Sequence, residues 1–263
     1  MAEIDYESTW WALIYDQYNS GLRKKTHEKE LSFYSSELAR CKGPVLEVAC
    51  GTGMILLELL ERDIDIYGFD ISAAMLDMLY RKAADREIQD IRHRVTRQNM
   101  ADFKYDQLFD AIFIPASSFM MLTTQEEQIA CLKKVHAHLK VDGRFLLNFF
   151  IPDFEKDILG HAEASDHYGE LGDFVHPDTG ETIVVTHNQV SNIAEQTERY
   201  IWKFTSKDSE HEVPMHARWI YKEEFQLLLR LAGFRTWKLY GDFDRSEYRG
   251  RGKQESLIWI VEK

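Results

Sequence analysis

The chain has 263 residues, a formal net charge of −12 and three scattered cysteines without a Cys-x-x-Cys pair. This length suits one large domain or a domain with a sizeable insertion, and the negative charge disfavours DNA or RNA as a substrate because phosphate backbones are repelled. No apolar run is long enough to span a membrane, the acidic start lacks the features of a secretory signal, and scattered cysteines favour reduced thiols, so we expect a cytoplasmic protein.

The first 40 residues are predicted to form two helices. Trp11, Tyr15 and Tyr18 recur at helical spacing and can line one face of the first helix. Thr26 can cap a second helix that runs to about residue 40. Two interpretations of the first helix are open at this point: it docks on the core, or it forms a lid over a ligand site.

The segment Val45-Leu-Glu-Val-Ala-Cys-Gly-Thr-Gly-Met54 reads as a buried strand, a glycine turn and the start of a helix. Gly51 and Gly53 let the backbone turn sharply and approach a ligand. A dinucleotide-binding fold also begins in this way, but the third glycine of Gly-x-Gly-x-x-Gly would fall at Leu56. The pyrophosphate fingerprint therefore fails, which disfavours an NAD-dependent oxidoreductase.

Strands and helices alternate along the first half of the chain. We predict strands at 44–49, 65–70, 91–96, 108–114 and 144–150, and helices at 53–62, 72–84 and 124–140. A helix at 221–232 and strands at 234–240 and 255–261 follow later. This order predicts an α/β fold with a Rossmann-like, doubly wound seven-stranded sheet. Ligands bind such sheets at the carboxyl ends of the strands.

Residues 152–218 interrupt this alternation. Segments that begin at Thr182, Thr197 and His211 alternate in polarity and are rich in β-branched and aromatic residues, which is typical of antiparallel strands. We therefore predict a β-rich cap, formed by the insertion 152–218, over a core of residues 1–151 and 219–263. Residues 1–40 would form an N-terminal helical lid on that core.

Two motifs resemble those of a known family. Glu47-Val-Ala-Cys-Gly-Thr-Gly53, followed by Gly68-Phe-Asp-Ile-Ser-Ala-Ala-Met-Leu76, is similar to motif I and the next acidic loop of class I S-adenosylmethionine (SAM)-dependent methyltransferases. By layout the chain resembles aminosugar N,N-dimethyltransferases and related small-molecule N-methyltransferases. The segment around Tyr15 resembles the part that folds over SAM in such enzymes, which favours the lid. A histidine implicated in catalysis in that family is replaced here by Met121.

The resemblance implies SAM as the cofactor and a small-molecule substrate. The residues expected to bind the cofactor are Tyr15, Glu47, Ala49, Gly51, Gly53, Asp70, Ile71, Met75, Asn99, Met100, Ala101, Pro115 and Ser117. Asp70 ends the second strand, where a carboxylate can hold ribose hydroxyls. Asn99 stands where the family has a carboxylate.

The residues proposed for catalysis are His216, Arg218 and Tyr18; the first two share one face of a predicted strand that adjoins the core. The histidines show no metal-binding spacing, so no metal is expected. We expect methyl transfer to a small-molecule acceptor, with an amine nitrogen favoured over a hydroxyl, by a monomer or homodimer. The alternative is a catalytically silent SAM-binding partner or regulatory subunit, which the replacement at Met121 keeps open.

Overall fold

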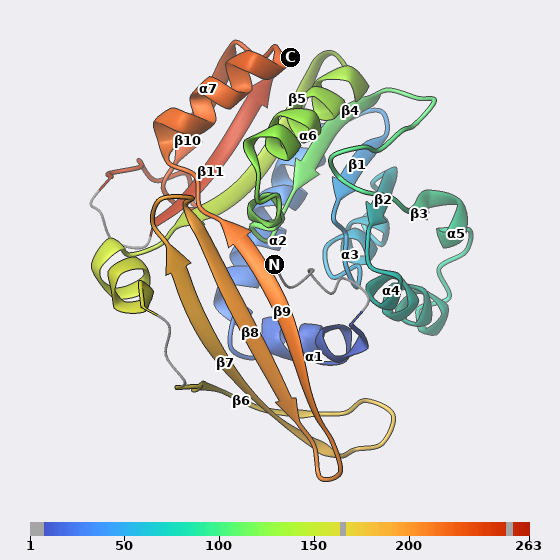
Figure 1. Cartoon of the computed structure of the whole chain (residues 1–263). Coiled ribbons are helices and arrows are strands. Elements are labelled where there is room, and N and C mark those ends of the chain that lie inside the picture. The colour runs from blue at the N-terminus through green and yellow to red at the C-terminus, as the bar shows by residue number, and fades with distance from the viewer. Residues whose placement is uncertain (1–7, 164–166, 251–254) are drawn as a thin grey trace.

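Two β-sheets organise the chain in the computed structural model, which describes residues 8–163, 167–250 and 255–263 (Figure 1). The main sheet has seven strands in the order β10-β11-β5-β4-β1-β2-β3. Its strands are β1 Val45–Val48, β2 Ile66–Asp70, β3 Val95–Arg97, β4 Phe109–Ile114, β5 Leu139–Ile151, β10 Thr236–Tyr240 and β11 Glu255–Glu262. Only β11 runs antiparallel to its neighbours β5 and β10. The predicted seven-stranded α/β fold is confirmed.

Helices cover both faces of the main sheet. The helices are α2 Lys24–Leu38, α3 Leu56–Leu60, α4 Ala73–Asp85, α6 Gln125–His138 and α7 Lys222–Ala232. Leu46 and Val48 of β1 pack in the cluster that contains α6 and α7, whereas Val45 packs with α2, α3 and α4. Period-two alternation thus sends successive β1 side chains into two apolar layers, which explains why this strand is apolar except at Glu47. Strands β2 and β3 lie on one side of β1, and β4 and β5 lie on the other side. The strand order therefore reverses between β1 and β4.

Four antiparallel strands form the second sheet, named the cap sheet here. They are β6 Gly169–Val175, β7 Thr182–Asn192, β8 Thr197–Thr205 and β9 Glu210–Arg218, paired in that order. The inner face of this sheet packs on α1 (Thr9–Ser20), through a cluster that includes Ile14, Val185, Trp202 and Phe204. The insertion therefore has an apolar core of its own that is completed by the N-terminal helix.

The helix α1 lies between the cap sheet and α4 (Figure 1). Gln17 exchanges two hydrogen bonds with the backbone of Val175 in β6, at 2.6 and 3.0 Å. On the other side Asp16 pairs with Lys82 of α4 at 2.5 Å and accepts from the Thr52 hydroxyl at 2.5 Å. The helix is thus fastened to both the cap and the core.

Several local predictions were wrong. The expected strand 91–96 is a helical turn, α5 Ile91–Arg94, followed by the short β3. Ile91 and Val95 are both buried, and their spacing of four suits one helical turn as well as a strand. Helix α2 begins at Lys24, before the proposed Thr26 cap, and its first turn has no side-chain cap. Strand β6 was not predicted.

The remaining short segments are η1 Ser118–Met121, η2 Phe154–Ile158 and η3 Leu159–His161. Helix α4 is capped by Ser72, whose hydroxyl accepts from the Met75 N–H at 3.2 Å. Within the described residues no helix is long and apolar enough to cross a membrane.

Candidate active site

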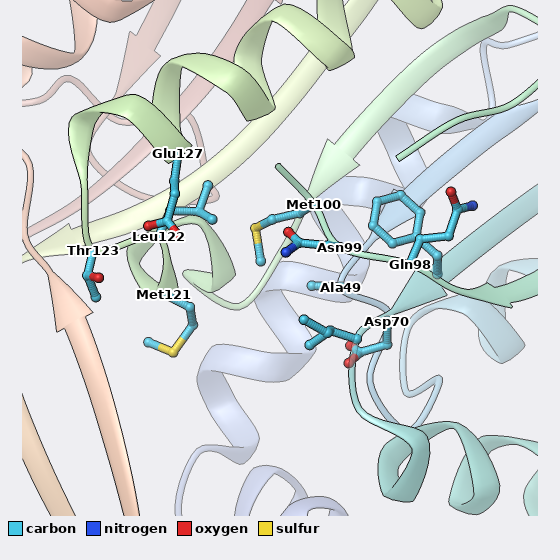
Figure 2. A pocket seen from close by; sticks show the side chains of 11 residues that line it. Ala49, Asp70, Gln98, Asn99, Met100, Met121, Leu122, Thr123 and Glu127 are labelled. Carbon is cyan, nitrogen blue, oxygen red and sulfur yellow. The ribbon is translucent and has the colours of Figure 1, made fainter. Parts of the chain in front are cut away.

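Two adjoining cavities lie at the carboxyl ends of β1, β2 and β4. The first, of about 280 Å³, is named the sheet-edge cavity and is lined by Ala49, Phe69, Asp70, Ile71, Gln98, Asn99, Met100, Met121, Leu122, Thr123 and Glu127. Figure 2 shows Asp70 and Gln98 on one side of this space, with Met121 and Thr123 on the other. The second, of about 310 Å³, is named the cap cavity and lies beneath the cap sheet and α1. The two cavities share Asp70, Ile71, Met100, Met121 and Ala49.

Asp70 stands at the junction of the two cavities and is 9% exposed. Its Oδ2 accepts from the Gly51 N–H at 2.8 Å, and its Oδ1 accepts from the Ser72 N–H at 2.9 Å. Burial raises the pKa of the Asp70 carboxyl, and these backbone hydrogen bonds oppose that rise. The carboxylate is therefore held in one orientation, with lone pairs left for a ligand.

The two glycines of the turn after β1 have different roles. Gly51 has φ of +52°, lines the cap cavity, and a Cβ placed there would meet no atom within 4 Å. A side chain would therefore occupy cavity space that a ligand can use. Gly53 lines neither cavity; a Cβ there would lie 2.8 Å from the Leu79 side chain. Gly53 thus permits close packing of α4.

Left-handed backbone recurs at the ends of two neighbouring strands. Ala49, after β1, has φ of +58°, and Ala116 and Ser117, after β4, have φ of +55° and +61°. All three line the cap cavity. Such conformations are costly for residues with a Cβ and cluster at functional sites. The N–H of Ala116 donates to buried Glu30 at 2.6 Å, which fixes the second turn.

Most of the predicted cofactor residues meet at these cavities. The cap cavity is lined by Tyr15, Ala49, Gly51, Asp70, Ile71, Met75, Met100 and Ser117, and the sheet-edge cavity by Asn99 in addition to the shared residues. Ala101 and Pro115 line neither cavity. The Asn99 amide oxygen accepts from the Ala101 N–H at 2.8 Å, so it shapes its own loop.

Glu47 lies behind the cavity wall and lines neither cavity. It is 2% exposed, and its Oε2 has no hydrogen-bond partner among the described residues. Burial raises the pKa of Glu47 well above its usual range, and the nearby Glu30 and Asp70 carboxyls raise it further. An acid at this place is held in its neutral form more readily than an exposed one.

The structure brings one of the three proposed catalytic residues to the site. Tyr18 lines the cap cavity. His216 and Arg218 do not. From β9 the cavity receives Val213, Met215 and Ala217 at alternating positions, and Pro214 beside them. Arg218 is 6% exposed; it donates to Glu224 of α7 at 2.7 Å and to Gln128 of α6 at 3.1 Å. It therefore fastens the end of the cap sheet to two core helices.

Sequence reasoning missed many of the lining residues, among them Arg23, Tyr200 and Trp202. Arg23 is the one cationic side chain among the described residues that line the two cavities. It follows the first helix in a segment that reads only as a basic connector. Tyr200 and Trp202 of β8 also line the cap cavity. Their spacing of two in an aromatic strand was a usable signal for a shared face.

Aromatic rings form a continuous wall of the cap cavity. Trp11 lies 5.0 Å from Trp202 and 5.5 Å from Tyr18 between ring centroids, and Tyr200 stacks on Trp202 at 6.0 Å. These four residues, all lining the cavity, are named the aromatic wall. Two come from α1 and two from β8, so the wall exists only where the helix and the cap sheet meet.

The residues present fit a nucleoside joined to a charged chain. Asp70 offers a carboxylate for a diol, and Ile71 and Met100 offer apolar contact for a flat base. Gly51 leaves open space beside its backbone, and Arg23 can pair with a carboxylate. These are the parts that S-adenosylmethionine contains.

Comparison with known proteins agrees with this arrangement. Residues 45–143 match the family model described as a methyltransferase domain. The chain is 26% identical over 214 residues to the cypemycin N-terminal methyltransferase of a Streptomyces species, which covers 81% of each protein. It is 31% identical over 136 residues, about half of each protein, to a Streptomyces fradiae dTDP-3-amino-3,6-dideoxy-alpha-D-glucopyranose N,N-dimethyltransferase.

A solved structure shares the fold over nearly the whole chain. It is an S-adenosylmethionine-dependent methyltransferase from Clostridium acetobutylicum, with a TM-score of 0.74 and 17% identity, and the match covers 95% of this chain and 97% of that one. At this identity the likeness concerns the fold. The family model and the sequence relatives show that residues 45–143 form a methyltransferase domain. The shared fold and the chemical groups that the site can hold agree with SAM as its cofactor.

Proposed function

We propose that this chain transfers the methyl group of SAM to an amine nitrogen of a small molecule. The observation that carries the proposal is the aromatic wall of Trp11, Tyr18, Tyr200 and Trp202, which faces the cap cavity next to Asp70. Aromatic faces attract ammonium groups and alkylated amines. A hydroxyl acceptor would gain no comparable benefit from these rings.

The names of the sequence relatives support nitrogen as the acceptor atom. One relative is an N-terminal methyltransferase, one is an aminosugar N,N-dimethyltransferase, and a further one is a glycine/sarcosine/dimethylglycine N-methyltransferase. The last is 27% identical over 91% of this chain. A shared preference for nitrogen is the simplest account of these names, and the acceptors themselves differ.

The cofactor would be held by residues of both cavities. Asp70 would accept from the ribose hydroxyls, and Ile71 and Met100 would contact the adenine, whose edge would lie near Gln98 and Asn99. Arg23 would pair with the carboxylate of the methionine part beside Gly51. When bound, SAM supplies a sulfonium-linked methyl group that a nucleophile can displace.

The chain itself would align the acceptor and exclude water. The cap cavity has Met120, Met121 and Phe150 on the core side and the aromatic wall on the other side, so an amine would be confined between them. Fixing two reactants in line is the main source of rate in such a transfer. The Asp16 and Gln17 contacts would keep α1 closed over the bound pair. A cytoplasmic location and a monomeric or homodimeric state stay predictions.

The test is a panel of matched acceptors incubated with SAM. The panel would pair aminosugar nucleotides, amino acids and peptides that have a free amino group with analogues in which a hydroxyl replaces the amine. We expect S-adenosylhomocysteine and N-methylated products from amines only. Product from the hydroxyl analogues alone would contradict the proposal. Binding of S-adenosylhomocysteine without any transfer would favour the catalytically silent SAM-binding partner instead.

A further inference from the structure

A buried carboxylate, that of Glu198, lies beside the aromatic wall. Glu198 of β8 is 1% exposed and shares a strand face with Tyr200 and Trp202. The Tyr200 hydroxyl donates to Glu198 Oε2 at 2.7 Å, and the Gln189 amide donates to Oε1 at 2.8 Å. Both donors are neutral side chains, so neither cancels the charge of the carboxylate.

Charged and titratable groups from several elements surround the Glu198 carboxylate. Burial raises the pKa of Glu198, and Asp157 of η2 raises it further, whereas its two hydrogen bonds and His161 of η3 oppose the rise. His187 of β7, whose ring lies 5.0 Å from Trp202, and Tyr18 of α1 are further titratable groups near the pair. A charge in such a place is costly unless a partner of opposite sign arrives.

Tyr200 is the link between Glu198 and the cavity. Tyr200 lines the cap cavity, whereas Glu198 does not. Because the Tyr200 proton points to Glu198, the lone pairs of its oxygen are left for another donor. The carboxylate also makes that oxygen a stronger acceptor, since hydrogen bonds in a chain polarise one another.

We propose that Tyr200 and Glu198 form the ammonium-recognising end of the cap cavity and select an acceptor amine that binds in its cationic form. Only the neutral amine has the lone pair that displaces the methyl group, so the bound ammonium releases one proton to water before the transfer. Tyr200 contacts the ammonium group through its ring and hydroxyl oxygen, and Glu198 acts through Tyr200 as a positioning residue that supplies the opposite charge. This inference rests on the proposed function and names the substrate class. The competing interpretation is structural: Glu198 merely ties β8 to β7 through Gln189.

The experiment uses choline as the probe, because its quaternary nitrogen cannot be methylated or deprotonated. The matched probe is its uncharged isostere, in which carbon replaces the nitrogen. Both are titrated by NMR into the full-length chain saturated with S-adenosylhomocysteine. We expect the wild type to bind choline at least about tenfold more tightly than the isostere. Glu198→Gln should reduce this preference at least about threefold, because only the attraction of the aromatic wall is left, while the exposed control Glu195→Gln should keep it in full.

A second measurement on the wild type needs no substitution. Choline does not titrate, so a pH dependence of its affinity reports on the protein. Because the pKa of Glu198 is raised, choline affinity should fall as the pH is lowered toward acid, whereas the affinity of the isostere should stay constant. In Glu198→Gln the smaller preference for choline should not change over this pH range.

Equal affinity of the wild type for the two probes, including no binding of either, would overturn the inference. So would a preference for choline that stays undiminished in Glu198→Gln, and so would equal losses of both probes in that variant, which a structural role predicts. The readout is separate from catalysis. Methylation of amines without a choline preference would refute this inference alone, and a choline preference without methylation of any amine would refute the proposed function alone.

Discussion

Replacing Asp70 by asparagine tests the cofactor site with almost no change in shape. The two carboxylate oxygens of Asp70 accept from the N–H groups of Gly51 and Ser72. Asparagine keeps one oxygen and puts an NH₂ group where the other oxygen was. One of the two backbone N–H groups then faces this NH₂ group, which is a donor and cannot accept its hydrogen bond. The substitution also removes the charge that would strengthen hydrogen bonds from two ribose hydroxyls.

The size of the effect follows from these contacts. A hydrogen bond to a charged group contributes about 1.5–3 kcal/mol and a neutral one about 0.5–1.5 kcal/mol, so the loss of one bond and the weakening of the other reduce binding by about 3 kcal/mol. This corresponds to a Kd that rises at least about 100-fold. The assay is calorimetric titration with S-adenosylhomocysteine of the wild type, Asp70→Asn and Asp77→Asn. Asp77 is an exposed residue of the neighbouring helix α4, so its variant controls for the change of charge.

Thermal unfolding without ligand would show whether Asp70→Asn keeps the fold. A variant that melts like the wild type and yet binds at least about 100-fold more weakly would agree with the reasoning. A folded Asp70→Asn that binds within about threefold of the wild type would refute it, because Asp70 could then make no important contact with the cofactor.

Three further predictions concern residues around the cavities. Because the pKa of Glu47 is raised, the folded chain keeps a proton that the unfolded chain releases above about pH 4.5, and the free energy of unfolding falls as the pH rises. Glu47→Gln should reduce this fall in urea unfolding measured from acid to neutral pH. An unchanged slope of the unfolding free energy against pH would contradict the prediction. Arg23→Gln should weaken S-adenosylhomocysteine at least about tenfold but leave adenosine, which lacks the carboxylate, unchanged in calorimetry; equal losses for both would argue against the assigned pairing. Asp16→Asn should loosen α1, with about two- to fivefold faster release of S-adenosylhomocysteine in stopped-flow experiments, and unaltered release would show that the contact with Lys82 does not hold the lid.

The main sheet could be predicted because its signals are local and redundant. The apolar run of β1 must be covered on both faces, and the glycine turn and Asp70 then fall at the carboxyl ends of adjacent strands. Parallel strands bring such ends together whatever the details of the loops. For this reason Gly51, Asp70 and Ile71 reach one cavity as expected.

The cap was harder to predict because a period of two leaves the choice of face open. On β9 the polar residues His216 and Arg218 suggested an active surface, but Met215 and Ala217 face the cavity instead. What decides the face is the packing of the cap sheet on α1, a contact between segments about 200 residues apart in the chain, together with the ion pair of Arg218 and Glu224. Arg23 was missed for a similar reason, since only the position of α1 brings the connector to the cavity.

The central claim is transfer of a methyl group from SAM to nitrogen, and an isotope label tests it most directly. The wild type and Asp70→Asn would be incubated with SAM labelled in its methyl group and with the amine and hydroxyl acceptors, and the labelled atom would be located by NMR. The account predicts label on the nitrogen of an amine with the wild type and strongly reduced label with Asp70→Asn. Label on oxygen or carbon of an acceptor would contradict it. So would the absence of label from every acceptor when the labelled SAM is at a saturating concentration.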